Sequence, residues 1–179
     1  MDSRLHDVLR DIHAFSCISN LAYETTRKLS PELYNEIMIS ILYRLMHLSF
    51  DTDPLQESIR TGLIALSSAI FVQRDILQHP YDHLARVYSN ALVKLRNSTD
   101  LTLPVPIVLW LTMVLHLVAQ KELSPTDWQS IWLDETVLHT GINTWPQALD
   151  ILRSVVWVSF MHDRIGQRVI EATILRLQI

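Results

Sequence analysis

The chain is poor in the residues on which disulfide scaffolds, zinc clusters and turn-rich β folds depend. Among its 179 residues are one cysteine, Cys17, and three glycines. A single cysteine excludes an internal disulfide and a multi-cysteine zinc site, and it suits a reducing compartment such as the cytoplasm or the nucleus. Because glycines are few and the leucine- and isoleucine-rich segments repeat with helical spacing, we expect an all-α protein.

Basic residues are also few, and they do not cluster. The chain has 15 Lys and Arg against 19 Asp and Glu, a formal net charge of −4 with neutral histidines. Without a basic stripe, direct nucleic-acid binding is not expected. The sequence lacks a phosphate loop, a dinucleotide fingerprint and a nucleophile elbow, so we expect neither a metal nor an organic cofactor. The charged residues Asp2, Arg4 and Asp7 are not typical of a secretory signal peptide.

One long segment, from Leu101 to Gln120, carries no acidic or basic side chain. Its length is close to that of a transmembrane helix. Pro104 and Pro106 interrupt its first third, and the helix left after Pro106 would rise only about 20 Å, against a hydrocarbon core of about 30 Å. We therefore expect a buried central helix and no membrane span.

Helix-capping residues divide the sequence into seven or eight segments. Apolar residues recur at helical spacing within them, and Gly141 suits a left-handed helix end. We therefore predict one domain over residues 1–179, a compact bundle of seven to eight helices around the apolar central helix. The predicted starts are Ser30-Pro31, Asp53-Pro54, Pro80, Pro106, Ser124-Pro125 and Thr144.

The two ends of the chain give further expectations. We expect the seventh helix to run from Thr144 to about Asp163, and the last helix to start at about Gly166. His162, Asp163 and Arg164 would then lie together at the exit of the seventh helix. The N-terminal residues from about 4 to 28 are predicted to form a less regular helix or a helix pair.

Two blocks of this sequence resemble a known family. The first is LYRLMHLSFDTDPLQESIRTGLIALSSAIFVQ, residues 42–73. The second begins with LPVPIVLWLTMV, residues 103–114, and continues through Trp128 and Trp145 to VVWVSFMHDRIG, residues 155–166. In order and spacing they are similar to the regulatory domain of fungal-specific transcription factors of the zinc-binuclear-cluster type. The resemblance covers residues 32–171.

The resemblance implies an all-α fold and does not extend to DNA binding. Regulators of this family read DNA through an N-terminal module in which six cysteines hold two zinc ions, followed by a basic linker. One cysteine cannot build that module, because zinc needs several closely spaced thiolate or imidazole ligands. The family domain senses ligands or holds regulatory contacts, and it has no shared catalytic residues to carry over.

The central helix offers the most interesting single polar residue, His116. A buried imidazole is pushed towards the neutral form, which suits a base. The alternative is a core histidine bonded to a backbone carbonyl. Trp110 and Met113 could line a ligand cavity on the same helix, or simply fill the core.

Three other groups could carry chemistry. His162 and Asp163 could form a proton-transfer pair, although neighbours on a helix point about 100° apart. Arg44 and His47 could be a polar handle for a ligand, or Arg44 could pair structurally with Asp51, Asp53 or Glu57. His79 and His83 have the spacing of two metal ligands, but no third ligand is fixed and His79 precedes a proline.

Three functional hypotheses follow. In the first, the chain is a stand-alone regulatory-type domain that binds an apolar small molecule or a partner protein. In the second, the bundle is a cofactor-free isomerase or cyclase, of the Diels–Alderase kind, acting on a terpenoid or polyketide in an apolar cavity. In the third, it is a fragment or a dimerising competitor of a full regulator. An enzyme predicts a closed cavity with His116, Arg44 or His47 inside, and a dimer predicts an exposed apolar patch.

Overall fold

The computed structural model describes residues 1–25, 27, 30–71, 82–98, 103–118 and 124–178. Within these ranges the chain forms eight α-helices and no strand, which confirms the all-α prediction. The helices are α1 (Ser3–Glu24), α2 (Pro31–Met46), α3 (Pro54–Phe71), α4 (Asp82–Arg96), α5 (Val105–Val118), α6 (Trp128–Thr140), α7 (Trp145–Val155) and α8 (Ser159–Leu177). The N-terminal segment is one regular helix, not a helix pair.

Helix α5 is the centre of the bundle, as its apolar sequence predicts. It packs against α3, α4, α6, α7 and α8, and nine of its residues are buried. Its 14 residues rise about 21 Å. In the described part of the chain, no helix combines the length and apolar character needed to cross a membrane.

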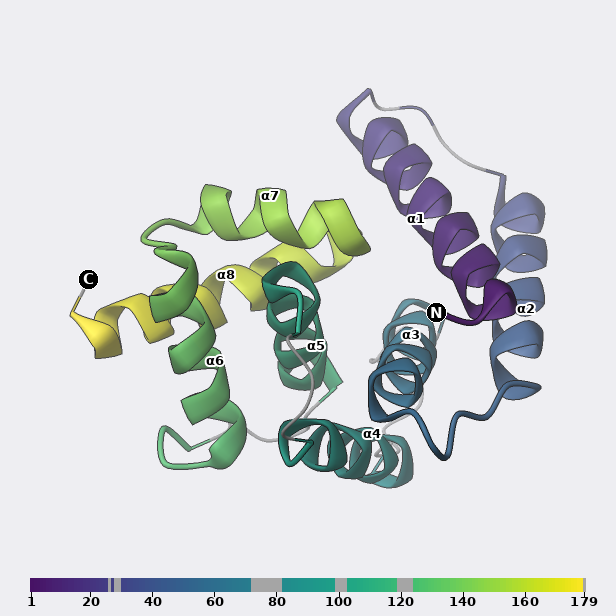
Figure 1. Ribbon diagram of the computed structural model, residues 1–179. Helices are drawn as coiled ribbons and strands as arrows, with labels where there is room; N and C mark the ends of the chain where they lie inside the picture. The colour runs from purple at the N-terminus through teal and green to yellow at the C-terminus, as the bar shows by residue number, and fades with distance from the viewer. Residues whose placement is uncertain (26, 28–29, 72–81, 99–102, 119–123, 179) are drawn as a thin grey trace.

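The remaining helices lie on two sides of α5. Helices α1 and α2 pack against each other and against α3, while α6, α7 and α8 lie on the opposite side (Figure 1). The C-terminal end of α1 and the N-terminal end of α2 extend beyond the body of the bundle (Figure 1). We call this helix pair the arm. Helix α1 also contacts α8, which links the first helix of the chain to the last.

Several helix ends follow the predicted capping chemistry. The Ser30 hydroxyl accepts from the Leu33 amide at 3.2 Å, and the Asp53 carboxylate accepts from the Gln56 amide at 3.0 Å. Gly141 ends α6 with a left-handed φ of 69°. The start predicted at Ser124 is wrong, because the chain first makes a turn in which the Ser124 amide donates to the Asp127 carboxylate. Helix α6 begins after that turn, with Asp127 at its cap position.

Most of the apolar residues that recur at helical spacing are buried, but the first of them on α2 is not. Ile41, Leu45, Tyr88 and Leu95 are no more than 1% exposed. Leu33 is 47% exposed, so it does not lie on the buried face as its spacing predicts. It lies near the start of α2, in the arm, where little of the bundle covers the helix.

The predicted boundary between the last two helices is also wrong. Helix α7 ends at Val155, the backbone of Val156 is extended (φ −156°, ψ 115°), and α8 begins at Ser159. Three β-branched valines surround this break, and such side chains favour extended backbone. His162, Asp163 and Arg164 therefore lie near the start of α8 and not at the exit of a helix.

Gly166 does not start the last helix; it lies inside α8 because it must be small. A Cβ atom at this position would lie 2.7 Å from Trp157 Cζ2 and 2.9 Å from Trp145 Cη2. Both rings belong to the packed region around the α7–α8 junction, where they stack edge to face with centroids 6.3 Å apart. The glycine thus allows α8 to approach two tryptophans closely.

We predict that Gly166→Ala destabilises the protein by about 1–3 kcal/mol, because the added methyl group must displace a tryptophan ring. In an unconstrained helix the same substitution would stabilise by about 1 kcal/mol. Urea unfolding followed by circular dichroism measures the difference, with Gln167→Ala at the exposed neighbouring position as control. A Gly166→Ala variant as stable as the control would contradict this packing.

Candidate functional site

The α7–α8 junction is defined as residues 155–159, and it is held by side chains from α1 and α5. His13 Nδ1 donates to the Val155 carbonyl at 2.7 Å, and Trp110 Nε1 donates to the Val156 carbonyl at 2.7 Å. Asn20 Nδ2 donates to the Trp157 carbonyl at 2.8 Å. Each of these carbonyls lies where the backbone leaves the helix, so the side chains replace helical hydrogen bonds.

Asn20 makes a second contact with the junction, at the start of α8. Its Oδ1 accepts from the Ser159 amide at 2.8 Å, so one amide side chain satisfies both a carbonyl and an N–H group. Asn20 is only 9% exposed. Two bonds on one buried side chain fix the position of α1 relative to α8.

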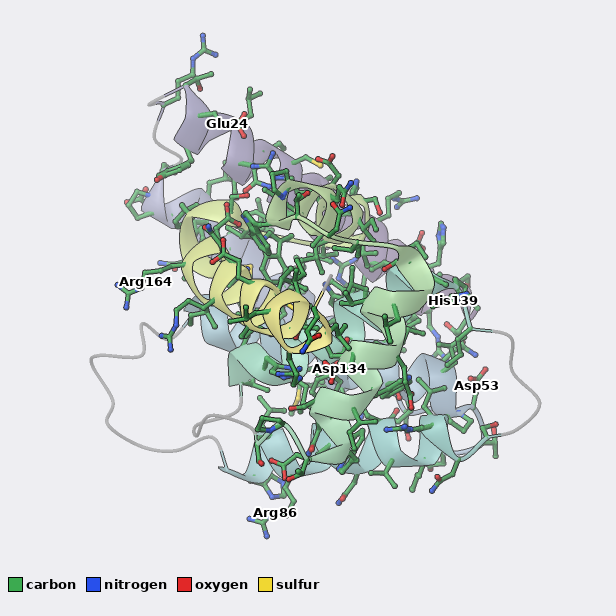
Figure 2. All side chains as sticks on the ribbon, turned by 90° about the vertical axis from the view of Figure 1, so that its left-hand side faces the viewer. Glu24, Asp53, Arg86, Asp134, His139 and Arg164 are labelled. Carbon is green, nitrogen blue, oxygen red and sulfur yellow. The ribbon has the colours of Figure 1, made fainter. Side chains whose placement is uncertain are left out.

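Asp163 and His162, in the first turns of α8, both contact this junction but form no hydrogen bond with each other. Asp163 Oδ1 accepts from Trp157 Nε1 at 2.8 Å. His162 Nδ1 accepts from the Val158 amide at 3.3 Å, and the imidazole packs edge-on against the Trp157 ring. Each side chain is therefore engaged with the junction. Arg164, next in the chain, projects outward from α8 (Figure 2).

Burial dominates the electrostatics of His162. The side chain is 4% exposed, and burial lowers its pKa to about 4. Because Nδ1 accepts a hydrogen bond, the proton of the neutral ring resides on Nε2. Nε2 is buried and has no hydrogen-bond partner among the described residues. The imidazole is thus a neutral packing group near pH 7.

His116 lies at a different part of the bundle. Its Nδ1 donates to the Thr112 carbonyl at 2.9 Å, one turn earlier on α5. Burial lowers its pKa, the Thr112 bond partly opposes this, and Arg176 and Asp134 act on it from α8 and α6. This is the bonding of a core histidine that its sequence position suggested. Asp134 lies beside the C-terminal part of α8, where it pairs with Arg176 (Figure 2).

The other candidate residues lie on α5, on α2 and at the C-terminal cap of α2. Trp110 and Met113 are fully buried on α5. Arg44 is half-buried on α2 and pairs with Asp11 of α1 at 2.8 Å, not with the acids that follow it in sequence. His47 is exposed and bonds the Tyr43 carbonyl at 2.7 Å. His79 lies outside the described residues. The roles suggested for these residues in ligand binding stay predictions.

A groove of about 310 Å³ opens between the arm and the start of α8. Helix α8 contributes Phe160, α1 contributes Tyr23, and α2 contributes Tyr34. Tyr23 and Phe160 face each other with ring centroids 5.6 Å apart, and Tyr34 packs on Phe15 at 5.4 Å. The full lining is Ser19, Ala22, Tyr23, Arg27, Pro31, Tyr34 and Phe160. None of the residues singled out in the sequence belongs to it.

Polar groups in the groove are few and distinct. Ser19 is 3% exposed, and its hydroxyl has no hydrogen-bond partner in the described part of the chain. Burial raises the pKa of Tyr34 above its usual value of 10, so its phenol stays protonated. Arg27 is exposed and adds a positive charge at the rim. Apolar walls with a few polar groups are typical of small-molecule sites.

No family model, curated protein or solved structure matches this chain. Within the described ranges, no three His, Cys, Asp or Glu side chains come close enough to hold a metal ion.

We predict that Asn20→Ala destabilises the protein by about 2–4 kcal/mol, because the Trp157 carbonyl and the Ser159 amide would both remain buried without a partner. Ser19→Ala, one residue earlier, is the matched control. Its hydroxyl makes no bond, so this change should leave the stability within about 0.5 kcal/mol. Equal effects of the two variants in urea unfolding would refute the role of Asn20.

A second prediction concerns pH. The pKa of His162 is about 4 in the folded chain, against a usual value of 6.5. Between these values the unfolded chain binds the proton more strongly, so lowering the pH should reduce the free energy of unfolding, by about 3 kcal/mol in total. His162→Gln should flatten this dependence between pH 6.5 and pH 4, whereas His6→Gln at an exposed position should not. Parallel pH profiles for wild type and His162→Gln would show that the buried imidazole is not responsible.

Proposed function

We propose that the chain is a binding module of regulatory type, which holds an apolar small molecule in the groove between α1, α2 and α8. The observation that carries the proposal is a groove of about 310 Å³ whose walls are aromatic side chains from three helices, Tyr23 of α1, Tyr34 of α2 and Phe160 of α8.

The groove suits a small and mainly apolar ligand. Its volume is at the lower end of the range of small-molecule sites, about 300–1,000 Å³. The Tyr23 and Phe160 rings offer faces for an aromatic or alicyclic group. The Tyr34 phenol and the Arg27 guanidinium add polar groups to this mainly apolar lining, and the positive charge of Arg27 favours a polar or acidic substituent on the ligand.

A binding role is better supported than catalysis. Each of the two candidate imidazoles forms a hydrogen bond with the backbone four residues earlier: His116 with the Thr112 carbonyl and His162 with the Val158 amide. His162 lies in the first turns of α8, whereas His116 lies on α5 and is influenced by Arg176, near the other end of α8. The two imidazoles therefore belong to different parts of the bundle. Asp163, the third candidate, holds the Trp157 indole.

The proposal agrees with the resemblance to a regulator's helical domain. That resemblance suggests ligand sensing, and the chain has a net charge of −4, which disfavours direct contact with nucleic acid. We therefore propose that the ligand binds between the arm and the start of α8. A ligand in the groove would contact residues next to the α7–α8 junction. Asn20 follows the groove residue Ser19 on α1, and it bonds Ser159, which precedes the groove residue Phe160. We therefore propose that ligand binding alters the packing at this junction.

The test is a titration of the full chain with anilinonaphthalene sulfonate, a fluorescent apolar anion. We expect saturable binding that Phe160→Ala weakens about tenfold, equivalent to about 1.4 kcal/mol for the loss of one aromatic wall. Ala22→Trp should abolish it by filling the groove. Ala22 lines this space, so the larger side chain leaves no room for the probe.

The control is Leu175→Ala, which removes a side chain of α8 that is 80% exposed and does not line the groove. It should leave the affinity for the probe unchanged. If the probe binds the two groove variants as well as it binds wild type, the groove is not the site. Circular dichroism on each variant separates a loss of binding from a loss of fold.

A further inference from the structure

The outer face of α2 carries an apolar stripe that nothing in the described chain covers. It consists of Ile39, Tyr43 and Met46, which are 58%, 66% and 68% exposed. Their spacing, four and then three residues, places them on one side of the helix. We name these three residues the α2 stripe.

The α2 stripe lies opposite the face by which α2 joins the bundle. That inner face consists of Met38, Ile41 and Leu45, all 0% exposed. A helix that is apolar on both faces has an outer face that is costly to leave in water. Several exposed apolar side chains on one side of a helix are typical of a surface that contacts another protein.

The side chains at the ends of the α2 stripe differ in charge. Glu36 is exposed, one turn before Ile39. His47 is exposed, directly after Met46, and its ring stacks on Tyr43 with centroids 4.2 Å apart. The stripe is thus acidic at its beginning and ends in an imidazole.

This pattern is self-complementary when a second copy of α2 runs antiparallel. A two-fold axis that crosses the outer face of α2 at the level of residue 41 would place Ile39 of each copy opposite Tyr43 of the other. Glu36 of each copy would then lie beside Met46 and His47 of the other, so a carboxylate meets an imidazole twice. Two-fold contacts in which each surface serves as both partners are the commonest form of protein oligomer. A parallel arrangement would instead place the two Glu36 carboxylates together.

We propose that the protein forms an antiparallel two-fold dimer through the α2 stripe. The groove is not part of this contact. Tyr34, which lines the groove, is separated from the middle of the α2 stripe by about 150° around the axis of α2. Dimerisation therefore leaves the groove open, and the two proposals can fail independently.

The experiment measures the mass of the full chain by sedimentation equilibrium over a range of concentrations. Wild type should be a dimer, and Tyr43→Glu should weaken association at least a hundredfold, because it buries a carboxylate against an apolar side chain. Met46→Glu is the second variant of this kind. Both positions are exposed in the monomer, so the helical circular dichroism should not change.

Two variants serve as matched controls. Leu175 is 80% exposed on α8, and Leu21 is 59% exposed on α1. Leu175→Glu and Leu21→Glu should leave the dimer intact. A monomeric wild type overturns the proposal and leaves the stripe for another protein. A dimer that survives Tyr43→Glu but not Leu21→Glu would place the interface on α1 and equally overturn it.

A charge exchange tests the antiparallel direction. His47→Glu alone brings two carboxylates together at each end of the interface, and should weaken the dimer at least fivefold. Glu36→Lys combined with His47→Glu makes each of these contacts an ion pair and should restore the affinity to that of wild type or better. If the double variant is as weak as His47→Glu alone, the two positions do not meet and the antiparallel contact is refuted.

Discussion

Three backbone carbonyls at the α7–α8 junction must find partners, and the rest of the structure is arranged around them. The chain leaves the helix at Val155 in the middle of the core, where water cannot reach the freed groups. His13 and Asn20 of α1 and Trp110 of α5 supply the missing donors. Without these side chains the break would be a buried defect, and with them it becomes the point at which α1, α5, α7 and α8 meet.

The same junction determines the shape of the groove. Asn20 of α1 bonds Ser159 of α8. Because Ser19 precedes Asn20 and Phe160 follows Ser159, this bond brings Ser19 and Phe160 to the same groove. The groove is therefore built from both ends of the sequence. Its walls are aromatic and its polar groups are few, which fits binding by shape and a small number of hydrogen bonds. The imidazoles that could perform chemistry are committed to packing elsewhere.

Much of the fold can be predicted from local chemistry. Ser30, Asp53 and Gly141 identify helix ends because their capping interactions involve only residues within one turn. The break at Val156 gives only a weak local signal, because β-branched valines surround it but no proline or glycine marks it, and distant side chains stabilise it. Gly166 suggested the start of a helix, but a glycine is required there because the Trp145 and Trp157 rings leave no room for a side chain. The groove could not be predicted, because Tyr23, Tyr34 and Phe160 meet only once α1, α2 and α8 are placed in space.

The bonds at the junction also have a consequence for biosynthesis. Asn20 and the Trp157 carbonyl are 137 residues apart in sequence. A nascent chain that has emerged only as far as α6 has all of α1 and α5, but it lacks every acceptor for the donors on His13, Asn20 and Trp110. In such a chain the Trp110 indole N–H lacks its native acceptor, and the face of α5 that packs on α7 and α8 is exposed. Exposed apolar surface of this kind favours contact with chaperones. These bonds of the native core can therefore form only after residues 155–157 have left the ribosome.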